Sequence, residues 1–169
     1  GIYNLEQEIN NLYALGFLNS ILSFYVANTL NPTVSTSITD IEKIPFVIPS
    51  KKIEVIVSNL SSNCISIKKQ LFTNHLLEPN YIKSPLIAFQ GASLKDRVLA
   101  YLNDENMQHT QVLINEAIIN ELIFEVYELS DADREQVEAK MGISIGSLSL
   151  LKEAKDAFLA QFQNPLAEV

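Results

Sequence analysis

The sequence is poor in the residues from which most cofactor and metal sites are built. Its 169 residues include no tryptophan, one cysteine, two histidines and five glycines. A single cysteine, Cys64, excludes an internal disulfide and fits a reducing compartment. The glycines form neither a phosphate-cradling loop nor a dinucleotide fingerprint, and His75 and His109 do not share a metal-ligand spacing with Cys64. We therefore expect no catalytic, cofactor-binding or metal site in this chain.

Positive charge and long apolar runs are also scarce. Twelve lysine and arginine residues stand against 20 aspartate and glutamate residues, which gives a net charge of −8 and a pI near 4.7. Because cationic side chains bind nucleic acids by displacing counterions from phosphates, the chain alone is expected to bind nucleic acid weakly. No apolar run has the length of a membrane span. We therefore expect no membrane contact and a cytoplasmic location.

Hydrophobic residues make up 47% of the chain, which is ample for a packed core. The first residue is Gly1 rather than methionine, and large apolar residues are already dense between Ile2 and Tyr25. We interpret this start as the cut end of a longer protein. A complete domain that follows a tag-cleavage scar is the alternative.

Apolar residues at helical spacing dominate the chain. They predict a mostly buried first helix that ends where Asn31 precedes a proline, because proline cannot donate the next helical hydrogen bond. A long amphipathic helix is expected from Ser50, its N-cap, through Leu71. The helix that opens at Ser93 is expected to break or bend at residues 103–106.

Further helix ends carry local signals. Capping boxes and a C-terminal glycine are predicted at Ser93 with Asp96, Ser130 with Asp133, and Gly142. The apolar stripe of a last helix consists of Leu151, Ala154, Phe158 and Phe162. These signals predict a predominantly helical chain.

One segment breaks the helical pattern. β-Branched and aromatic residues between Ile38 and Ile48 fit an extended frame, and Pro45 and Pro49 would confine such a strand to the edge of a sheet. The predicted fold class is therefore mainly α, with one short β segment near the N-terminus. We expect residues 1–49 to form a helix, a polar loop and an edge strand, and residues 50–169 to form a helical domain.

Two segments resemble parts of DNA methyltransferases. "LGFLNSILSFYVANTLNPTVSTSITDIEKIPFVIP", residues 15–49, resembles the segment that closes the target recognition domain of restriction-modification proteins. "INEAIINELIFEVYELSDADREQVEAKMGI", residues 114–143, resembles a block near the carboxyl end of large adenine-specific DNA methyltransferases, especially those of BREX phage-defence systems and fused restriction-modification enzymes. Residues 64–87 are only loosely similar to the stretch that connects these blocks in the family.

The resemblance implies a non-catalytic C-terminal fragment that supports recognition of double-stranded DNA in a parent enzyme. The family's glycine-rich S-adenosylmethionine loop and its Asn-Pro-Pro-aromatic tetrapeptide are absent, so the cofactor would belong to the parent and none to this fragment. Other defence-system subunits are further expected partners. Possible DNA contacts are Asn31, Thr33, Ser35 and Thr36 in the polar loop, and Lys51, Lys52, Lys68 and Lys69 in the helix after it. A solvated loop and a solvated helix face are the alternatives for these residues.

A second interpretation belongs to a different functional class. The chain would be a helical protein-interaction or assembly module that docks partner subunits through exposed apolar stripes. Exposed apolar surface and capture of a protein partner without an effect on DNA binding would favour it. No constellation of residues in the sequence supports an independent enzyme.

Overall fold

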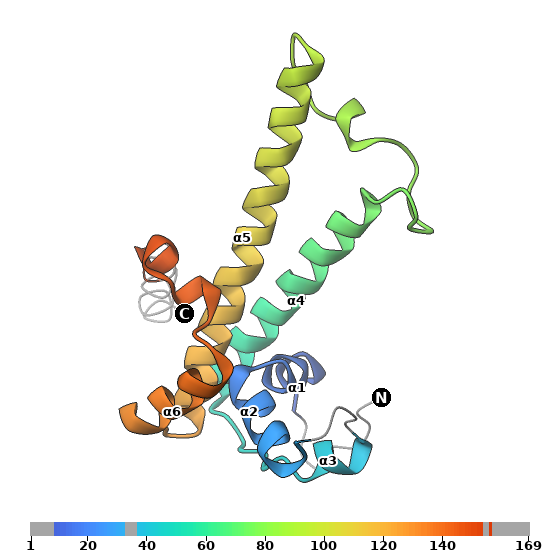
Figure 1. Ribbon diagram of the computed structural model, residues 1–169. Coiled ribbons are helices and arrows are strands. Elements are labelled where there is room, and N and C mark those ends of the chain that lie inside the picture. Colours follow the sequence, from blue (N-terminus) through green and yellow to red (C-terminus); the bar gives the residue numbers. More distant parts are fainter. Residues whose placement is uncertain (1–8, 33–36, 154–155, 157–169) are drawn as a thin grey trace, which may run out of the picture.

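The computed structural model describes residues 9–32, 37–153 and 156, and this part of the chain is mainly α-helical, as the sequence predicts (Figure 1). Residues 149–153 are helical as well. The α-helices are α1 (Asn11–Leu18), α2 (Ile21–Leu30), α3 (Ile38–Glu42), α4 (Lys51–Thr73), α5 (Leu94–Val126) and α6 (Asp131–Met141), and the 3-10 helices are η1 (Pro85–Ile87) and η2 (Ile145–Ser147).

The predicted helix ends are confirmed by their hydrogen bonds. The Ser50 hydroxyl accepts a hydrogen bond from the backbone N–H of Ile53 at the start of α4. Complete capping boxes open α5 at Ser93 and α6 at Ser130. Gly142 ends α6 with a φ of 88°, a conformation that glycine adopts without steric cost.

Two helix predictions need correction. The single first helix is divided into α1 and α2, because Ser20 adopts an extended backbone and its hydroxyl caps α2 at the N–H of Ser23, 3.2 Å away. The helix does not break at residues 103–106, since α5 continues from Leu94 to Val126. In the predicted last helix, Leu151 is helical, whereas Ala154, Phe158 and Phe162 lie outside the described residues.

The predicted short β segment is not confirmed, and no strand occurs within residues 9–32, 37–153 and 156. The chain instead forms α3, because Ser37 and Asp40 make the same capping box that opens α5 and α6. The spacing of Ile38 and Ile41 fits a helical turn as well as a strand. Residues 45–50 have no regular secondary structure. The backbone groups of Pro45 and Val47 are hydrogen-bonded to a side chain at the C-terminal end of α5 rather than to a neighbouring strand.

That side chain belongs to Tyr127, the C-cap residue of α5. Its hydroxyl donates to the carbonyl oxygen of Pro45 at 2.5 Å and accepts from the N–H of Val47 at 3.2 Å. The Phe17 ring stacks on Tyr127 at a centroid distance of 5.7 Å and meets the edge of Phe46 at 5.2 Å. These contacts fix the segment between α3 and α4 against α1 and α5.

The hydrophobic core lies where α1 and α2 pack against α4 and α5, with Val137 of α6 at its margin. It contains residues from both sides of the expected boundary between residues 49 and 50. We call this packed region the body. Its buried cluster comprises Tyr13, Phe17, Leu22, Ile56, Val57, Leu60, Ile114, Ile118, Ile119, Ile123, Phe124 and Val137.

The far ends of α4 and α5 extend away from the body and diverge, and residues 74–93 join them (Figure 1). We call the C-terminal end of α4, this connection and the N-terminal half of α5 the arms. Five aliphatic side chains near the connection are between 63% and 95% exposed. This connector tip consists of Leu76, Leu77, Ile82, Ile87 and Leu94.

Candidate functional site

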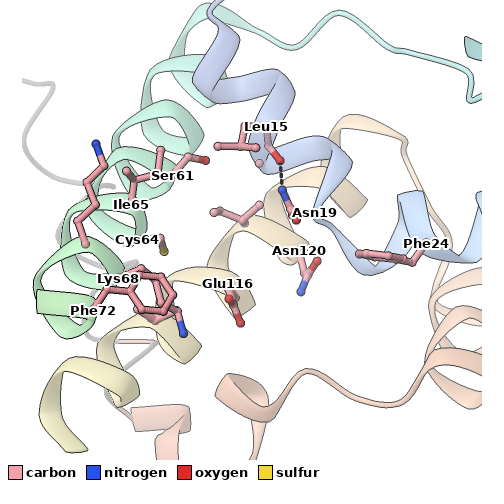
Figure 2. Close-up of a pocket in the computed structure, with 14 residues that line it drawn as sticks. Leu15, Asn19, Phe24, Ser61, Cys64, Ile65, Lys68, Phe72, Glu116 and Asn120 are labelled. Carbon is pink, nitrogen blue, oxygen red and sulfur yellow. Dashed lines mark hydrogen bonds between the residues drawn. The ribbon is translucent and has the colours of Figure 1, made fainter. Parts of the chain in front are cut away.

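A cavity of about 600 Å³ opens where α1, α2, α4 and α5 meet, at the base of the arms (Figure 2). Its volume is in the range typical of small-molecule sites. Apolar side chains form most of the wall, and a few polar groups interrupt them. The lining residues are Leu15, Gly16, Asn19, Phe24, Ser61, Cys64, Ile65, Lys68, Lys69, Phe72, Val112, Glu116, Ile119 and Asn120.

Gly16 allows α1 to approach α4 closely at the back of the cavity. A Cβ atom at Gly16 would lie 2.7 Å from the Ser61 hydroxyl oxygen and 2.7 Å from a methyl group of Val57. Ser61 itself is only 5% exposed, and its hydroxyl has no hydrogen-bond partner within the described part of the chain. A buried hydroxyl without a partner lowers the stability of a fold. The cavity therefore contains one polar group that the protein leaves unsatisfied.

Charged side chains reach the cavity from α4 and α5. Lys68 and Lys69 are exposed residues of α4, and Glu116 comes from the facing side of α5. Partial burial of its carboxyl group raises the pKa of Glu116, and the positive charge of Lys68 opposes this shift. The described residues contain no ion pair made by Lys68 or Lys69. The two ammonium groups thus outnumber the single carboxyl group at this site.

Cys64 is not equipped as a nucleophile. Burial raises the pKa of its thiol, and the largest opposing influence is a hydrogen bond that the Asn115 side-chain amide donates to Sγ at 3.6 Å. The reactive form of cysteine is the thiolate, which a raised pKa disfavours. Cys64 therefore serves as a wall of the cavity rather than as an attacking group.

The four lysines expected to contact DNA do not form one patch. Lys51 and Lys52 lie at the start of α4, about 25 Å along the helix axis from Lys68 and Lys69, given a rise of 1.5 Å per residue. Lys51 donates to Glu54 at 2.9 Å, and Glu54 also accepts from the backbone N–H of Asn10. Lys51 therefore helps to hold the first residues of α1 against α4.

The polar loop is described only in part. Thr33, Ser35 and Thr36 lie outside the described residues. The Asn31 side-chain amide donates to Asp40 at 2.8 Å, which joins the end of α2 to the start of α3. Hydrogen bonds from the Ser37 backbone and from the Asn31 and Ser37 side chains lower the pKa of Asp40 to about 2.

Sequence reasoning missed several residues that organise this region. Ser61 and Asn120 are polar residues that interrupt apolar stripes, which was the available signal for a polar group inside a cavity. Asn120 accepts a hydrogen bond from the N–H of Ile21 at 2.9 Å and so fixes the start of α2. Glu116 is exposed and also lines the cavity.

Other classes of site find no support in the described part of the chain. It contains no group of three or more histidine, cysteine, aspartate or glutamate side chains arranged to hold a metal ion. None of its helices combines the length and hydrophobicity that crossing a bilayer requires.

Comparisons of the chain with protein-family models, with curated proteins and with solved structures found no match.

Proposed function

We propose that the chain is the non-catalytic C-terminal part of an adenine-specific DNA methyltransferase or of a fused restriction-modification enzyme, and that it supports recognition of the DNA target by the parent protein. One observation supports this proposal above others. Residues 15–49 and 114–143, the two segments that resemble this family, pack against each other in the body although they are far apart in sequence. The loosely similar residues 64–87 lie mostly in the arms.

The contacts between the two segments are specific. Phe17 stacks on Tyr127, the Tyr127 hydroxyl bonds the backbone at Pro45 and Val47, and Asn120 accepts from the N–H of Ile21. A structural unit shared by a protein family needs such mutual contacts, because isolated helices of this length are marginally stable in water. The packing therefore agrees with both segments belonging to one inherited unit.

The proposed contribution to DNA binding is electrostatic. Lys52, Lys68 and Lys69 make no ion pair within the described residues, so their charges are available to phosphates, whereas Lys51 is held by Glu54. The net charge of −8 means that the remainder of the parent enzyme would supply most of the affinity. The chain would thus position the target rather than bind it alone.

The lysine set is tested in the full-length parent enzyme. Replacing Lys51, Lys52, Lys68 and Lys69 together by alanine is expected to weaken DNA binding and to reduce the salt slope of log K by about 0.9 for each lost phosphate contact. A matched variant replaces Lys83 and Lys95 by alanine, because these lysines belong to the arms and not to the proposed contact set. An unchanged salt slope in the fourfold variant would remove these lysines from the DNA interface.

The proposed absence of an S-adenosylmethionine site is tested on this chain alone. Titration with S-adenosylmethionine in a calorimeter is expected to give no heat of binding, because the motifs that hold this cofactor in the family are absent. Saturable binding of one cofactor per chain would contradict the proposal that this part is non-catalytic.

A second candidate, a protein-interaction or assembly module, is favoured by the connector tip. Its aliphatic side chains form an exposed apolar patch, with Leu77 95% and Ile82 90% exposed, and such patches are typical of interaction sites. We expect the double substitution Leu76→Ser and Leu77→Ser to leave folding unchanged. Loss of binding to a purified defence-system subunit in this variant, with unchanged DNA binding by the parent enzyme, would favour this candidate over the first.

A further inference from the structure

We infer that the cavity between α1, α2, α4 and α5 is a binding site for a small organic anion that has a planar, apolar body. The apolar walls would enclose the body, and Lys68 and Lys69 would meet the anionic group at the opening. This inference does not rest on the proposed role in DNA recognition, although Lys68 and Lys69 also belong to the proposed DNA contact set.

The shape of the opening favours a planar body. Phe24 of α2 and Phe72 of α4 lie on opposite sides of the cavity (Figure 2), and they are 52% and 53% exposed. Exposed phenyl rings lose the stabilisation that burial gives, and a flat ligand between them would restore it through ring contacts. Leu15, Ile65 and Ile119 add further apolar surface to the wall of the cavity.

Ser61 is a buried polar residue in the wall of the cavity. The residue is 5% exposed, and its hydroxyl has no hydrogen-bond partner within the described residues. Most buried hydroxyl groups in proteins are hydrogen-bonded. The hydroxyl oxygen has almost no accessible surface because it is packed against α1 at Gly16, so recognition of the ligand depends on the apolar walls and on the two lysines.

The charge balance favours an anion over a cation. Lys68 and Lys69 present two ammonium groups, and neither is neutralised by an ion pair within the described part of the chain. The opposing group is the single carboxyl of Glu116, so the positive charges at the opening exceed the negative ones by one. An anionic ligand would therefore meet a net attraction, whereas a cation would meet net repulsion.

A pair of fluorescent probes tests both parts of the inference on the present chain. The anionic probe is 8-anilinonaphthalene-1-sulfonate, and the neutral probe is N-phenyl-1-naphthylamine, which has the same aromatic body without the sulfonate. We expect saturable binding of one anionic probe per chain and an affinity about tenfold above that of the neutral probe. Substitution Lys68→Gln with Lys69→Gln is expected to remove this preference and to leave binding of the neutral probe unchanged.

Matched variants locate the probe. Lys52→Gln changes an exposed lysine of the same helix that does not line the cavity, and it is expected to preserve the preference. Ile65→Trp would fill the cavity and is expected to weaken both probes at least about tenfold, with the helical content checked by circular dichroism. The surface variant Leu76→Ser with Leu77→Ser is expected to bind both probes as the original chain does.

Several results would overturn the inference. Absence of saturable binding would exclude the site, and equal affinity for the two probes would exclude its anion selectivity. An equal loss of preference in Lys52→Gln would assign the effect to the overall charge. Loss of probe binding in the Leu76→Ser and Leu77→Ser variant would place the bound probe on the connector tip instead of in the cavity.

Discussion

The body and the arms are built from the same two helices, yet they are stabilised in different ways. In α5 no residue before Val112 is buried, whereas nine residues from Val112 to Phe124 are buried. Ile118 and Ile123 have no exposed surface, while Leu102 is 42% and Met107 is 66% exposed. One continuous helix thus passes from a packed core into solvent.

Local interactions hold the helix together where the core does not. The Ser93 and Asp96 capping box satisfies the first backbone donors of α5. Side chains four residues apart then pair along the arm, with Tyr101 donating to Glu105 at 3.0 Å and Gln108 donating to Asp104 at 2.6 Å. The α5 helix therefore depends on burial in the body, and on its cap and on pairs of neighbouring side chains in the arms.

The largest expected difference in stability is between two alanine substitutions in this one helix. Ile118→Ala would leave a cavity in the body and is expected to lower the free energy of unfolding by about 2–5 kcal/mol. Leu102→Ala removes an exposed side chain of the arm and is expected to change the free energy of unfolding by less than about 1 kcal/mol. Urea unfolding followed by circular dichroism measures both. Similar losses for the two variants would mean that the arms are packed against something in solution.

The next largest loss of stability is expected from a substitution at the contact between η2 and α5. Gly146 is buried, and a Cβ atom there would lie 2.1 Å from the carbonyl oxygen of Leu113 and 2.8 Å from Cβ of Ala117. Gly146→Ala is therefore expected to lower the free energy of unfolding by about 1–3 kcal/mol, because a backbone atom cannot yield as a flexible side chain does.

Gly142→Ala is the matched control for that substitution. A Cβ atom at Gly142 would meet nothing within 4 Å, but its φ of 88° disfavours an L side chain. Gly142→Ala is expected to lower the free energy of unfolding by about 1 kcal/mol, because of backbone strain alone. A larger loss for Gly142→Ala than for Gly146→Ala in thermal unfolding would show that η2 does not pack tightly on the body.

Ionisation of Tyr127 should affect the stability of the body. Burial raises the pKa of Tyr127 above its ordinary value of 10.0, although the hydrogen bond from the Val47 N–H opposes this shift. The unfolded chain then releases the proton at lower pH than the folded chain does. The stabilisation linked to the neutral phenol is complete below pH 10 and is lost as the pH rises through the higher folded value.

Tyr127→Phe tests this linkage. The variant loses the hydrogen bond to the Pro45 carbonyl, so the free energy of unfolding at neutral pH is expected to fall by about 0.5–1.5 kcal/mol. Its stability should also decline less steeply than that of the original chain above pH 10. Chemical denaturation at several pH values measures both effects. An identical alkaline decline would assign the pH dependence to other groups, such as Tyr13, whose pKa burial also raises.

Much of this fold was predictable because its signals are local. The N-cap at Ser50, the capping boxes at Ser93 and Ser130 and the glycine at 142 each act within a few residues of the chain. The same Ser-x-x-Asp pattern at Ser37 was hidden by β-branched neighbours, whose spacing fits a strand as well as a helix. The capping hydrogen bonds of Ser37 and Asp40 favour a helix in this segment.

The candidate site was less predictable because it depends on contacts between distant segments. Lys68, Glu116 and Phe24 come from three helices, and no spacing within the sequence indicates that they share one cavity. The hydrogen bonds of Tyr127 to residues 45 and 47 likewise link positions about 80 residues apart. Sequence periodicity identifies which residues face a core, but not which residues of different helices meet.

The smallest expected effect concerns Asp40, whose capping box can be compared with the one at Asp96 in the arms. Asp40 accepts hydrogen bonds from the Ser37 backbone and from the Asn31 side chain, which lower its pKa from 3.8 to about 2. Its contribution to α3 is therefore present above pH 3.8 and is lost as the pH falls through about 2.

Amide hydrogen exchange measures this local effect and separates it from global unfolding. In Asp40→Asn the amides of residues 40 and 41 should have lower protection factors at neutral pH, as they should in the original chain near pH 2, while the free energy of global unfolding changes least of all the variants. In Asp96→Asn the faster exchange should be confined to the first turn of α5. If Asp40→Asn instead accelerated exchange throughout α1 and α4, α3 would be an integral part of the body's cooperative unit, and the contrast between locally held and core-held helices would apply only to the arms.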